Sequence, residues 1–527
     1  MILVKPRGAL GGLLAGLAAA LVVACSSVRQ DVPRTPSHAL EVPEQTSLGR
    51  SIATRLAAAR GQSGFHLLVS GQDAFLARAA LAESAERTLD LQYYIVAEDA
   101  TATLLLYRAL HAAQRGVRVR LLLDDIYAAG RDFDLAALAA HPNVQVRVFN
   151  PFLRRGPLGI SQLLEYLGDS ERLNRRMHNK LWIADNAAAV VGGRNLGDAY
   201  FQAQSEGDFA DLDVLAGGPV VAQISRSFDD YWNSAWAVPI AAFLEAPPEG
   251  RRLELILSQM QARADRFRDT DYAAMLRTTG FGRAVRVGEF PLVSGPASAL
   301  YDKPARLDGA SGADEGGIVP ALRRLIESAQ REVILVSPYF IPSERGLEVL
   351  RTLTGRGVRV RVLTNSLASA DPVPVAHAGY ARYRARLLGR SVELHERRPG
   401  SRLQGSARAA LSSGATLHAK AVVVDRRFVL VGSMNLDPRS RHANTEVAVL
   451  VESEALAGQL AALFEEACTL DHAFRVELAR PGDEDAPLAW TGREDGKPAR
   501  YDREPLTSWW RRTFSRLLGL VAPEELL

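Results

Sequence analysis

In the first part of the chain, segments whose apolar residues repeat with a helical period alternate with segments whose apolar residues repeat with a strand period. Residues 73–86 and 102–114 repeat apolar side chains with a helical period, whereas residues 88–95 (T-L-D-L-Q-Y-Y-I) alternate like a strand. Gly116 ends the second helix, and the apolar run after it predicts another strand up to Asp125. Helices that alternate with strands predict an α/β fold, with a mainly parallel or mixed β-sheet flanked by helices.

The same order of elements returns further along the chain. Residues 331–336 form an apolar run typical of a strand, and residues 344–354 have a helical pattern. Residues 357–363 (G-V-R-V-R-V-L) then nearly repeat residues 116–122 (G-V-R-V-R-L-L). We therefore interpret the chain as an internal duplication of one α/β half.

The length of the chain supports this division. A chain of 527 residues with 47% hydrophobic content is larger than one core, which stops growing at roughly 250–300 residues. We predict a first half over residues 65–246 and a second half over residues 318–470, joined by a connector over residues 247–317. A polar tether over residues 26–64 and a tail over residues 471–527 would complete the body.

The tail contains a helical pattern over residues 509–521. Trp510, Phe514 and Leu517 share one face of this helix, with Arg512 and Arg516 near the other. The pattern is typical of a helix at a membrane interface, and a helix docked on its own domain is the alternative.

The N-terminus has the features of an export signal. Lys5 and Arg7 precede an apolar run over residues 9–24, which is short for a spanning helix of about 20 apolar residues. Cys25 follows a small residue, as in the bacterial lipobox, so residues 1–25 are predicted to be a lipoprotein-type signal with Cys25 as the lipidated residue. An uncleaved signal anchor is the alternative. The predicted location is the bacterial cell envelope, with a membrane-attached lipoprotein facing the periplasm.

Charge narrows the choice of partners. The 63 basic and 60 acidic residues give a net charge of +3, too near neutral to indicate bulk affinity for nucleic acid. Only five of the basic residues are Lys, and two of these, Lys180 and Lys420, each follow a His by two positions. Such positions favour a compact ammonium group, as in a phosphate binder, over the planar group of Arg.

These lysines belong to a motif, H-x-K-x-x-x-x-D, that occurs twice. The first copy contains His178, Lys180 and Asp185, and the second contains His418, Lys420 and Asp425. At equal spacing, each copy is followed by a small-residue turn and an Asn: G-G-R-N ends at Asn195, and G-S-M-N ends at Asn435. An acidic residue follows each turn, Asp213 in D-L-D-V and Glu446 in N-T-E-V.

Two His, two Lys and two Asn suit phosphodiester transfer without a metal or another cofactor. One neutral imidazole attacks phosphorus and forms a phosphohistidine, while the other, as imidazolium, protonates the leaving alcohol. The ammonium groups of Lys180 and Lys420 and the amides of Asn195 and Asn435 would hold the non-bridging oxygens. Asp213 and Glu446 would fix the tautomers of the two histidines.

With these motifs, the chain resembles the phospholipase D superfamily, whose members build one active site at the pseudo-twofold interface of two similar halves. The resemblance implies that His178 is the nucleophile and His418 the acid and base. It also implies a structural part for Asp185 and Asp425, although both belong to the catalytic motif. Four segments look closest to bacterial cardiolipin synthases of the C type: G-G-R-N-L-G-D-A-Y-F (192–201), D-L-D-V (211–214), G-S-M-N-L-D-P-R-S (432–440) and T-S-W-W-R-R (507–512).

The implied activity is phosphatidyl transfer between membrane phospholipids, with phosphatidylglycerol and phosphatidylethanolamine as expected substrates. The expected enzyme acts as a monomer at a membrane surface, without nucleic acid. Hydrolysis of phospholipids to phosphatidate is the first alternative, because the sequence does not say whether water or a lipid alcohol reaches the intermediate. The sequence also leaves open a nuclease of the same superfamily and a non-catalytic lipoprotein scaffold.

Overall fold

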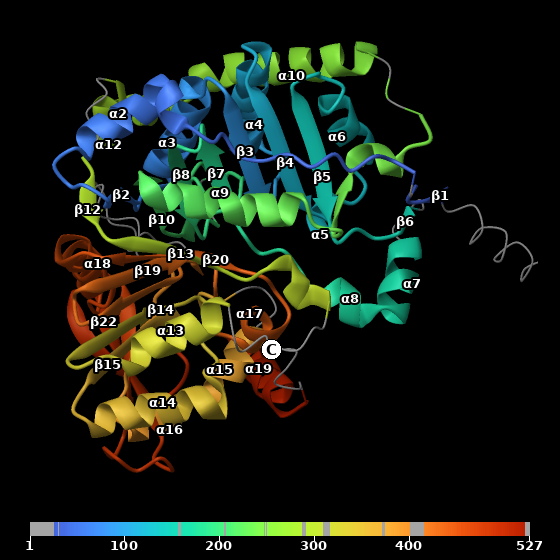
Figure 1. The fold of residues 1–527 in the computed structure, drawn as a ribbon. Coiled ribbons are helices and arrows are strands. Elements are labelled where there is room, and N and C mark those ends of the chain that lie inside the picture. Colours follow the sequence, from blue (N-terminus) through green and yellow to red (C-terminus); the bar gives the residue numbers. More distant parts are fainter. Residues whose placement is uncertain are drawn as a thin grey trace, which may run out of the picture.

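The computed structural model describes residues 26–521, apart from short stretches within that range (30, 156–159, 205–206, 247, 249, 287–290, 309–316, 371–374 and 401–415). The predicted signal peptide and Cys25 therefore lie outside the described residues. The described chain forms two stacked halves, each built on one large sheet (Figure 1).

The first half contains a nine-stranded sheet. Its strands lie in the order β11 (Ala237–Pro239), β5 (Val144–Phe149), β4 (Arg118–Asp124), β3 (Thr88–Tyr93), β7 (Leu181–Ala184), β8 (Ala188–Gly192), β10 (Asp213–Gly217), β2 (Ser63–Leu68) and β12 (Val293–Gly295). The strands β3, β4 and β5 are parallel, and the other neighbours are antiparallel. Helices α3 (Gly71–Ser84), α4 (Ala100–Gln114), α6 (Asp132–Leu138) and α10 (Gly250–Arg268) cover the outer face, while α9 (Pro219–Trp232) packs on the inner face.

The second half contains a ten-stranded sheet. Its strands lie in the order β13 (Ala297–Tyr301), β20 (Val447–Glu452), β19 (Phe428–Gly432), β18 (Ala421–Val424), β14 (Glu332–Val336), β15 (Arg359–Asn365), β16 (Glu393–Arg397), β21 (Ala473–Leu478), β22 (Leu488–Glu494) and β23 (Lys497–Tyr501). Helices α13 (Ile318–Glu327) and α14 (Ser343–Gly355) cover the outer face, and α18 (Glu454–Ala467) packs on the inner face.

The two sheets repeat one unit, which confirms the predicted duplication. The parallel strands β3, β4 and β5, followed by the antiparallel run β7, β8 and β10, match β14, β15 and β16 followed by β18, β19 and β20. Each sheet is mixed, with only three parallel strands. The alternation of helices and strands correctly predicts two of those three in each half, β3 with β4 and β14 with β15, but not β5 or β16. The hairpins β7–β8 and β18–β19 reverse the chain in tight turns that the periodicity does not show.

The inner faces of the two sheets share one hydrophobic core. Leu181, Ile183 and Val191 from the first half belong to the same buried cluster as Val423 and Val431 from the second half. The motif strands β7 and β18 run through this core, and the motif histidines lie directly before them. Burial of apolar side chains from both halves therefore fixes the two motifs relative to each other.

The predicted tether is wrong for residues 31–64, because this segment is attached to the first sheet along its length. Arg147, Arg120 and Arg118 donate hydrogen bonds to backbone oxygens of residues 35, 37 and 38 in turn, and α2 (Ser47–Arg55) follows. The composition of the segment resembles that of a flexible linker, but its backbone oxygens accept hydrogen bonds from arginines that are partly or fully buried, and these bonds hold it on the sheet.

The ends of the other predicted segments also differ. The tail over residues 471–527 contributes β21, β22 and β23 to the second sheet, and its last helix, α19 (Trp509–Val521), packs on α15 (Val375–Ala381). The connector over residues 247–317 completes both halves, because α10, α11 (Asp271–Thr278) and α12 (Gly280–Arg286) cover the first sheet while β12 and β13 form sheet edges. Within the described residues, we find no helix that is both long and apolar enough to cross a bilayer.

Candidate active site

The two motif histidines are held by backbone pairing between the halves. His178 N–H donates to Thr445 O at 2.9 Å, and Thr445 N–H donates to the oxygen of residue 176 at 2.8 Å. In the second copy, His418 N–H donates to Ala210 O at 2.8 Å, directly after β17 (Thr416–Leu417) pairs with β9 (Phe209–Ala210). Each histidine is thus positioned by the chain segment that carries an acid in the opposite half.

The acids complete this crossed arrangement. His178 Nδ1 lies 2.9 Å from Glu446 Oε2, and His418 Nδ1 lies 2.5 Å from Asp211 Oδ2. Both carboxyl groups are buried. Lys420 Nζ also lies 3.0 Å from His418 Nδ1. Because the contact of Nδ1 with Asp211 is shorter, we assign the Nδ1 hydrogen to the bond with Asp211. In both histidines Nε2 is then left for chemistry.

The prediction that Asp213 orients a histidine is wrong, because Asp211 occupies that place. Asp213 forms a buried ion pair with Arg78 at 2.9 Å and lies 3.5 Å from Arg194. The sheet register shows the correspondence: Gly192 pairs with Asp213, and Gly432 pairs with Ala448, so the residues two positions earlier are Asp211 and Glu446. Each acid lies two positions before the strand residue that pairs with the first Gly of its turn. This rule selects Asp211, and not Asp213, from the D-L-D-V segment.

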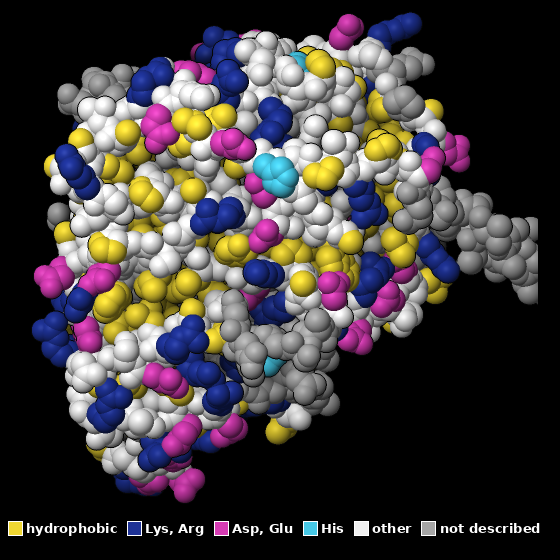
Figure 2. Space-filling view, in the orientation of Figure 1, with side chains coloured by type: hydrophobic (Ala, Val, Ile, Leu, Met, Phe, Trp, Pro, Cys, Tyr) yellow, Lys and Arg dark blue, Asp and Glu magenta, His cyan; other side chains and the backbone are white. Residues whose placement is uncertain are grey.

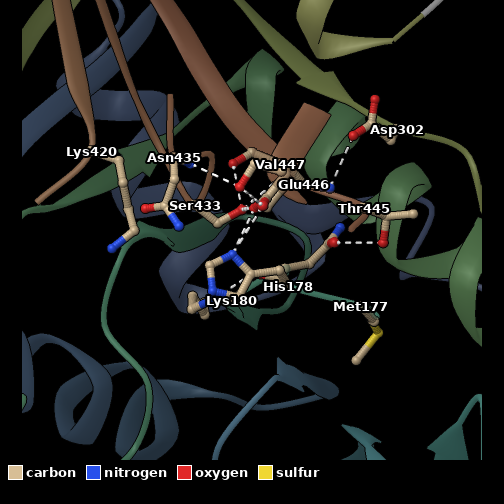
Figure 3. A network of polar contacts seen from close by, with 12 residues as sticks. Met177, His178, Lys180, Asp302, Lys420, Ser433, Asn435, Thr445, Glu446 and Val447 are labelled. Atoms are coloured by element: carbon tan, nitrogen blue, oxygen red, sulfur yellow. Dashed lines mark hydrogen bonds and ion pairs between the residues drawn. The ribbon is translucent and has the colours of Figure 1, made fainter. Parts of the chain in front are cut away.

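Glu446 lies in a hydrogen-bond network that the sequence did not reveal (Figure 3). Ser433 Oγ donates to Glu446 Oε2, Ser440 Oγ donates to Oε1 at 2.8 Å, and Glu446 N–H donates to Asp302 Oδ2 at 3.1 Å. Burial raises the pKa of Glu446 to about 7, against the lowering effect of Lys180 and of the serines. The network fixes the carboxyl group and, through it, the ring of His178.

The corresponding space in the first half is shaped for a shorter acid. A Cβ atom added at Gly193, the counterpart of Ser433, would lie 2.2 Å from Asp211 Oδ1. Gly193 is therefore required for the close approach of Asp211 to the turn. The G-G turn therefore accommodates the shorter Asp211, and the G-S turn bonds the longer Glu446.

The two lysines place their ammonium groups in the same site. Lys180 Nζ donates to His178 O at 2.5 Å and lies 5.4 Å from the ring centre of Tyr94, and Lys420 Nζ donates to His418 O. Burial lowers the pKa of Lys180 to about 7, with Glu446 opposing the shift and the nearby Lys420 contributing to it. A phosphate anion between the lysines would supply the missing negative charge and favour their charged forms.

The two motif asparagines have different environments. Asn195 Oδ1 accepts a hydrogen bond from Ile95 N–H at 3.1 Å, and its Nδ2 donates to Tyr200 Oη at 2.9 Å. Asn435 lies beside Lys420 and His178 in Figure 3, and its buried Oδ1 has no hydrogen-bond partner among the described residues. The Asn435 side chain is thus less fully bonded than that of Asn195, which supports the loop that leads to Tyr94.

The motif aspartates are structural, as the resemblance implies, and do not join the catalytic groups. Asp185 accepts three hydrogen bonds from the backbone N–H groups of residues 86, 87 and 88, at 2.8–2.9 Å. Asp425 accepts the equivalent bonds from residues 330, 331 and 332, at 2.7–3.2 Å. Both have a φ of 53° in the hairpin after the motif strand, so they fix that turn to the start of β3 or β14.

Charge and burial act differently on the two histidines. Burial, together with Lys180 and Lys420, holds the pKa of His178 well below its ordinary value. Burial and Lys420 also lower the pKa of His418, but Asp211 opposes them. The pKa of Asp211 is lowered despite its burial, mainly by His418 and Lys420, so this carboxylate stays ionised.

Aromatic rings that the sequence did not single out line both histidines. The ring of Tyr94 lies 5.1 Å from that of His178, and the rings of Tyr200 and Phe209 lie 5.4 Å and 5.1 Å from that of His418. These apolar neighbours contribute to the burial of the imidazoles. The two imidazoles and the two lysine side chains thus share one largely buried site.

Two buried imidazoles on crossed carboxyl groups, with one lysine beside each, define a two-histidine site for phosphodiester chemistry, assembled from a duplicated α/β fold. The family model described as "Cardiolipin synthase, PLD-like domain" matches residues 79–232 and 322–468. The chain therefore belongs to this phospholipase D-like family.

Individual relatives agree with this assignment. The chain is 40% identical over 474 residues to cardiolipin synthase C of Escherichia coli (strain K12), covering 89% of this chain and 97% of that protein. It is 27% identical to cardiolipin synthase A of Pseudomonas entomophila (strain L48), covering 75% and 66%. Its fold is similar to the crystal structure of phosphatidylserine synthase from Haemophilus influenzae Rd KW20, with a TM-score of 0.56, 15% identity, and 90% of this chain and 100% of that chain covered.

Proposed function

We propose that the protein transfers a phosphatidyl group from one membrane phospholipid to a hydroxyl group of another, through a phosphohistidine intermediate on His178. The observation that carries the proposal is the crossed pair of histidines, each held by a buried acid of the opposite half beside a lysine. The 40% identity to a protein named cardiolipin synthase C, over most of both chains, supports the same reaction class.

In the first step, the lone pair of His178 Nε2 attacks phosphorus while the bond from phosphorus to the headgroup oxygen breaks. His418, as imidazolium, gives its Nε2 proton to that oxygen, so the headgroup leaves as a neutral alcohol. Lys180, Lys420 and the Asn435 amide hold the non-bridging oxygens as negative charge builds on them. The products are the free headgroup alcohol and phosphatidyl-His178.

In the second step, neutral His418 removes the proton of an acceptor hydroxyl group, whose oxygen attacks phosphorus as the bond to His178 Nε2 breaks. A lipid alcohol as acceptor gives a diphosphatidyl product, and water gives phosphatidate. Hydrolysis remains the second candidate because both reactions use the same groups.

The electrostatic asymmetry of the site supports this division of roles. His178 is held strongly in its neutral form, which a nucleophile requires. His418 faces an ionised carboxylate at 2.5 Å, which stabilises the imidazolium form that the leaving group requires. The pKa of Glu446 is raised to about 7, so Glu446 stabilises the imidazolium form of His178 less than Asp211 stabilises that of His418.

The substrates and location belong to the same proposal. We take phosphatidylethanolamine as the donor and phosphatidylglycerol as the acceptor, because only the phosphatidylglycerol headgroup has free hydroxyl groups. We also propose a monomer attached to the membrane on the periplasmic side through lipidated Cys25. Figure 2 shows acidic and basic side chains interspersed over one face of the molecule, without one dominant basic area, which does not favour a nuclease. On α19, the side chains of Trp509, Trp510 and Leu517 are exposed and would contact lipid.

The test is a lipid assay in mixed micelles with labelled phosphatidylglycerol, with and without phosphatidylethanolamine. We expect labelled cardiolipin and no product from His178→Ala or His418→Ala. Phosphatidate as the sole lipid product would assign hydrolysis instead. Cleavage of DNA, with no change in any phospholipid, would refute the proposal.

A further inference from the structure

The described chain begins at one edge of the first half, in a short sheet. The strand β1 (Ser26–Ser27) pairs antiparallel with β6 (Arg154–Arg155), so Ser26 lies opposite Arg155 (Figure 1). Val28 N–H then donates to Leu153 O at 3.3 Å, and the Val28 side chain is buried in the core of the first half. The start of the described chain is therefore fixed on the body.

Cys25 is bonded directly to Ser26, and consecutive Cα atoms lie about 3.8 Å apart. A lipid on Cys25 would thus emerge at the β1–β6 edge, without a linker between the lipid and the body. Because the acyl chains must enter the bilayer at that point, the neighbouring surface has to lie against lipid headgroups.

That surface carries an exposed apolar helix. After β6, α7 (Ile160–Gly168) places Leu163, Leu164 and Leu167 in solvent, with 58%, 47% and 71% of each residue exposed, and α7 contacts β6. Leu153, beside β6, is 46% exposed. Neighbouring exposed leucines of this kind mark an interaction site in a water-soluble body.

The charged group of α7 is directed away from this apolar face. Glu165 accepts hydrogen bonds from the backbone N–H groups of Leu153 and Arg154, both at 2.9 Å, and pairs with Arg172 at 2.5 Å. The Glu165 side chain is only 9% exposed. A helix whose single carboxylate is neutralised on its inner side presents an apolar surface that suits the headgroup and acyl boundary of a membrane.

We propose that the leucine face of α7, with Leu153, inserts into the lipid bilayer next to the lipidated Cys25 and so fixes the body on the membrane. This inference rests on the proposed lipidation of Cys25. Its consequence is that one edge of the first half meets the bilayer directly. α8 (Ser170–Asn174) follows α7 and ends four residues before His178, so the docked edge is also close in the chain to the nucleophile.

The test uses the full-length protein reconstituted in phosphatidylglycerol–phosphatidylethanolamine vesicles. An environment-sensitive fluorophore is attached to Leu167→Cys or to the control Leu255→Cys, an exposed leucine of α10; the only cysteine in the described part of the chain, Cys468, is buried. We expect brominated lipids to quench the label at position 167 and not the label at position 255. Equal quenching at both positions, or none at 167, would overturn the inference.

Two further measurements distinguish a failure of this inference from a failure of the proposed lipidation of Cys25 or of the proposed transfer activity. Mass spectrometry of the N-terminus reports lipidation of Cys25 independently of the label. Leu163→Glu/Leu167→Glu should reduce transfer on vesicles and leave transfer between short-chain soluble lipids unchanged, whereas Leu255→Glu should change neither. A label at position 167 that is shielded without lipid and becomes exposed on dilution would identify a second copy of the chain as the occupant and refute membrane docking.

Discussion

Replacing Asp211 by asparagine removes the negative charge that faces His418 while keeping the shape of the side chain. The amide oxygen of the Asp211→Asn variant can still accept the hydrogen bond that Leu212 N–H donates to Oδ1 at 2.8 Å, so the loop should keep its conformation. An amide nitrogen would then face His418 Nδ1. Because two donors cannot bond to each other, the imidazole would move its hydrogen to Nε2, and neutral His418 could no longer act as a base.

The expected loss follows from these two effects. A hydrogen bond to a charged group contributes about 1.5–3 kcal/mol, which corresponds to roughly a 10- to 150-fold change in rate. The tautomer change adds to this loss, and the same Asp-to-Asn substitution in a Ser-His-Asp triad reduces kcat by ~10⁴. We expect a loss in kcat between these limits. The basic limb of the pH–rate profile should move to lower pH, because Asp211 raises the pKa of His418 in the wild type.

The assay uses a soluble phosphodiester with a nitrophenyl leaving group. This group leaves readily without full protonation, so the first step should survive in Asp211→Asn while the second step fails. The expected result is a burst of one nitrophenolate per enzyme and accumulation of phosphohistidine, followed by slow turnover.

Asp213→Asn is the matched control, two positions away in the same D-L-D run. It leaves buried Arg78 and Arg194 without their carboxylate, which should cost about 3–5 kcal/mol of folding free energy and lower the urea midpoint. Turnover per folded molecule should change little. Wild-type turnover by Asp211→Asn, or a burst from Asp213→Asn with an unchanged urea midpoint, would refute the assignment of Asp211.

Other predictions concern the remaining groups. Lys180→Arg and Lys420→Arg should lose nearly as much activity as the Ala variants, because a planar cation does not fit the place of a compact ammonium; near-normal kcat for both would contradict this role. Asp425→Ala should lower the free energy of unfolding by about 1–3 kcal/mol, measured in urea, and leave kcat per folded molecule unchanged, since its carboxylate binds only backbone N–H groups. Activity should persist in excess EDTA; loss of activity that added metal restores would show that the lysines are not sufficient as charge stabilisers. Deletion of residues 507–527 should reduce activity on bilayers more than on short-chain soluble diesters, and an equal loss on both would show that α19 serves only as packing on α15.

The repeated parts of the fold could be predicted from the sequence because their signals are local. The apolar periods gave α3, β3 and α4 within a few residues of their ends, and the G-V-R-V-R repeat gave β4 and β15. The segment over residues 31–64 was misassigned because its structure depends on hydrogen bonds from distant arginines. Composition records that a segment is polar, but it does not record which residues supply its hydrogen bonds.

In the site, too, residues within the repeated motif could be predicted, and residues that depend on contacts between distant segments could not. Both histidines, both lysines and Glu446 follow from the spacing of the repeated motif, and the structure brings them together. Asp211 was missed because an extra loop lengthens the first copy between Asn195 and the acid, and only the strand register resolves the two aspartates. Two residues that bond Glu446 could not be found from the repeat: Ser440 stands where the first copy has Tyr200, and Asp302 lies in a segment without any repeated pattern.

The exchange of acids between the halves has a consequence for how such a chain could have arisen. A single half on its own would carry a histidine and a lysine, but the carboxyl group for that histidine would be on another molecule. A symmetric dimer of two such halves would place each histidine against the carboxyl group of the other subunit, and the duplicated chain keeps this exchange within one molecule. The two copies are no longer identical, because Asp211 with Gly193 stands where the other copy has Glu446 with Ser433. The two histidines therefore face carboxyl groups whose pKa values are shifted in opposite directions.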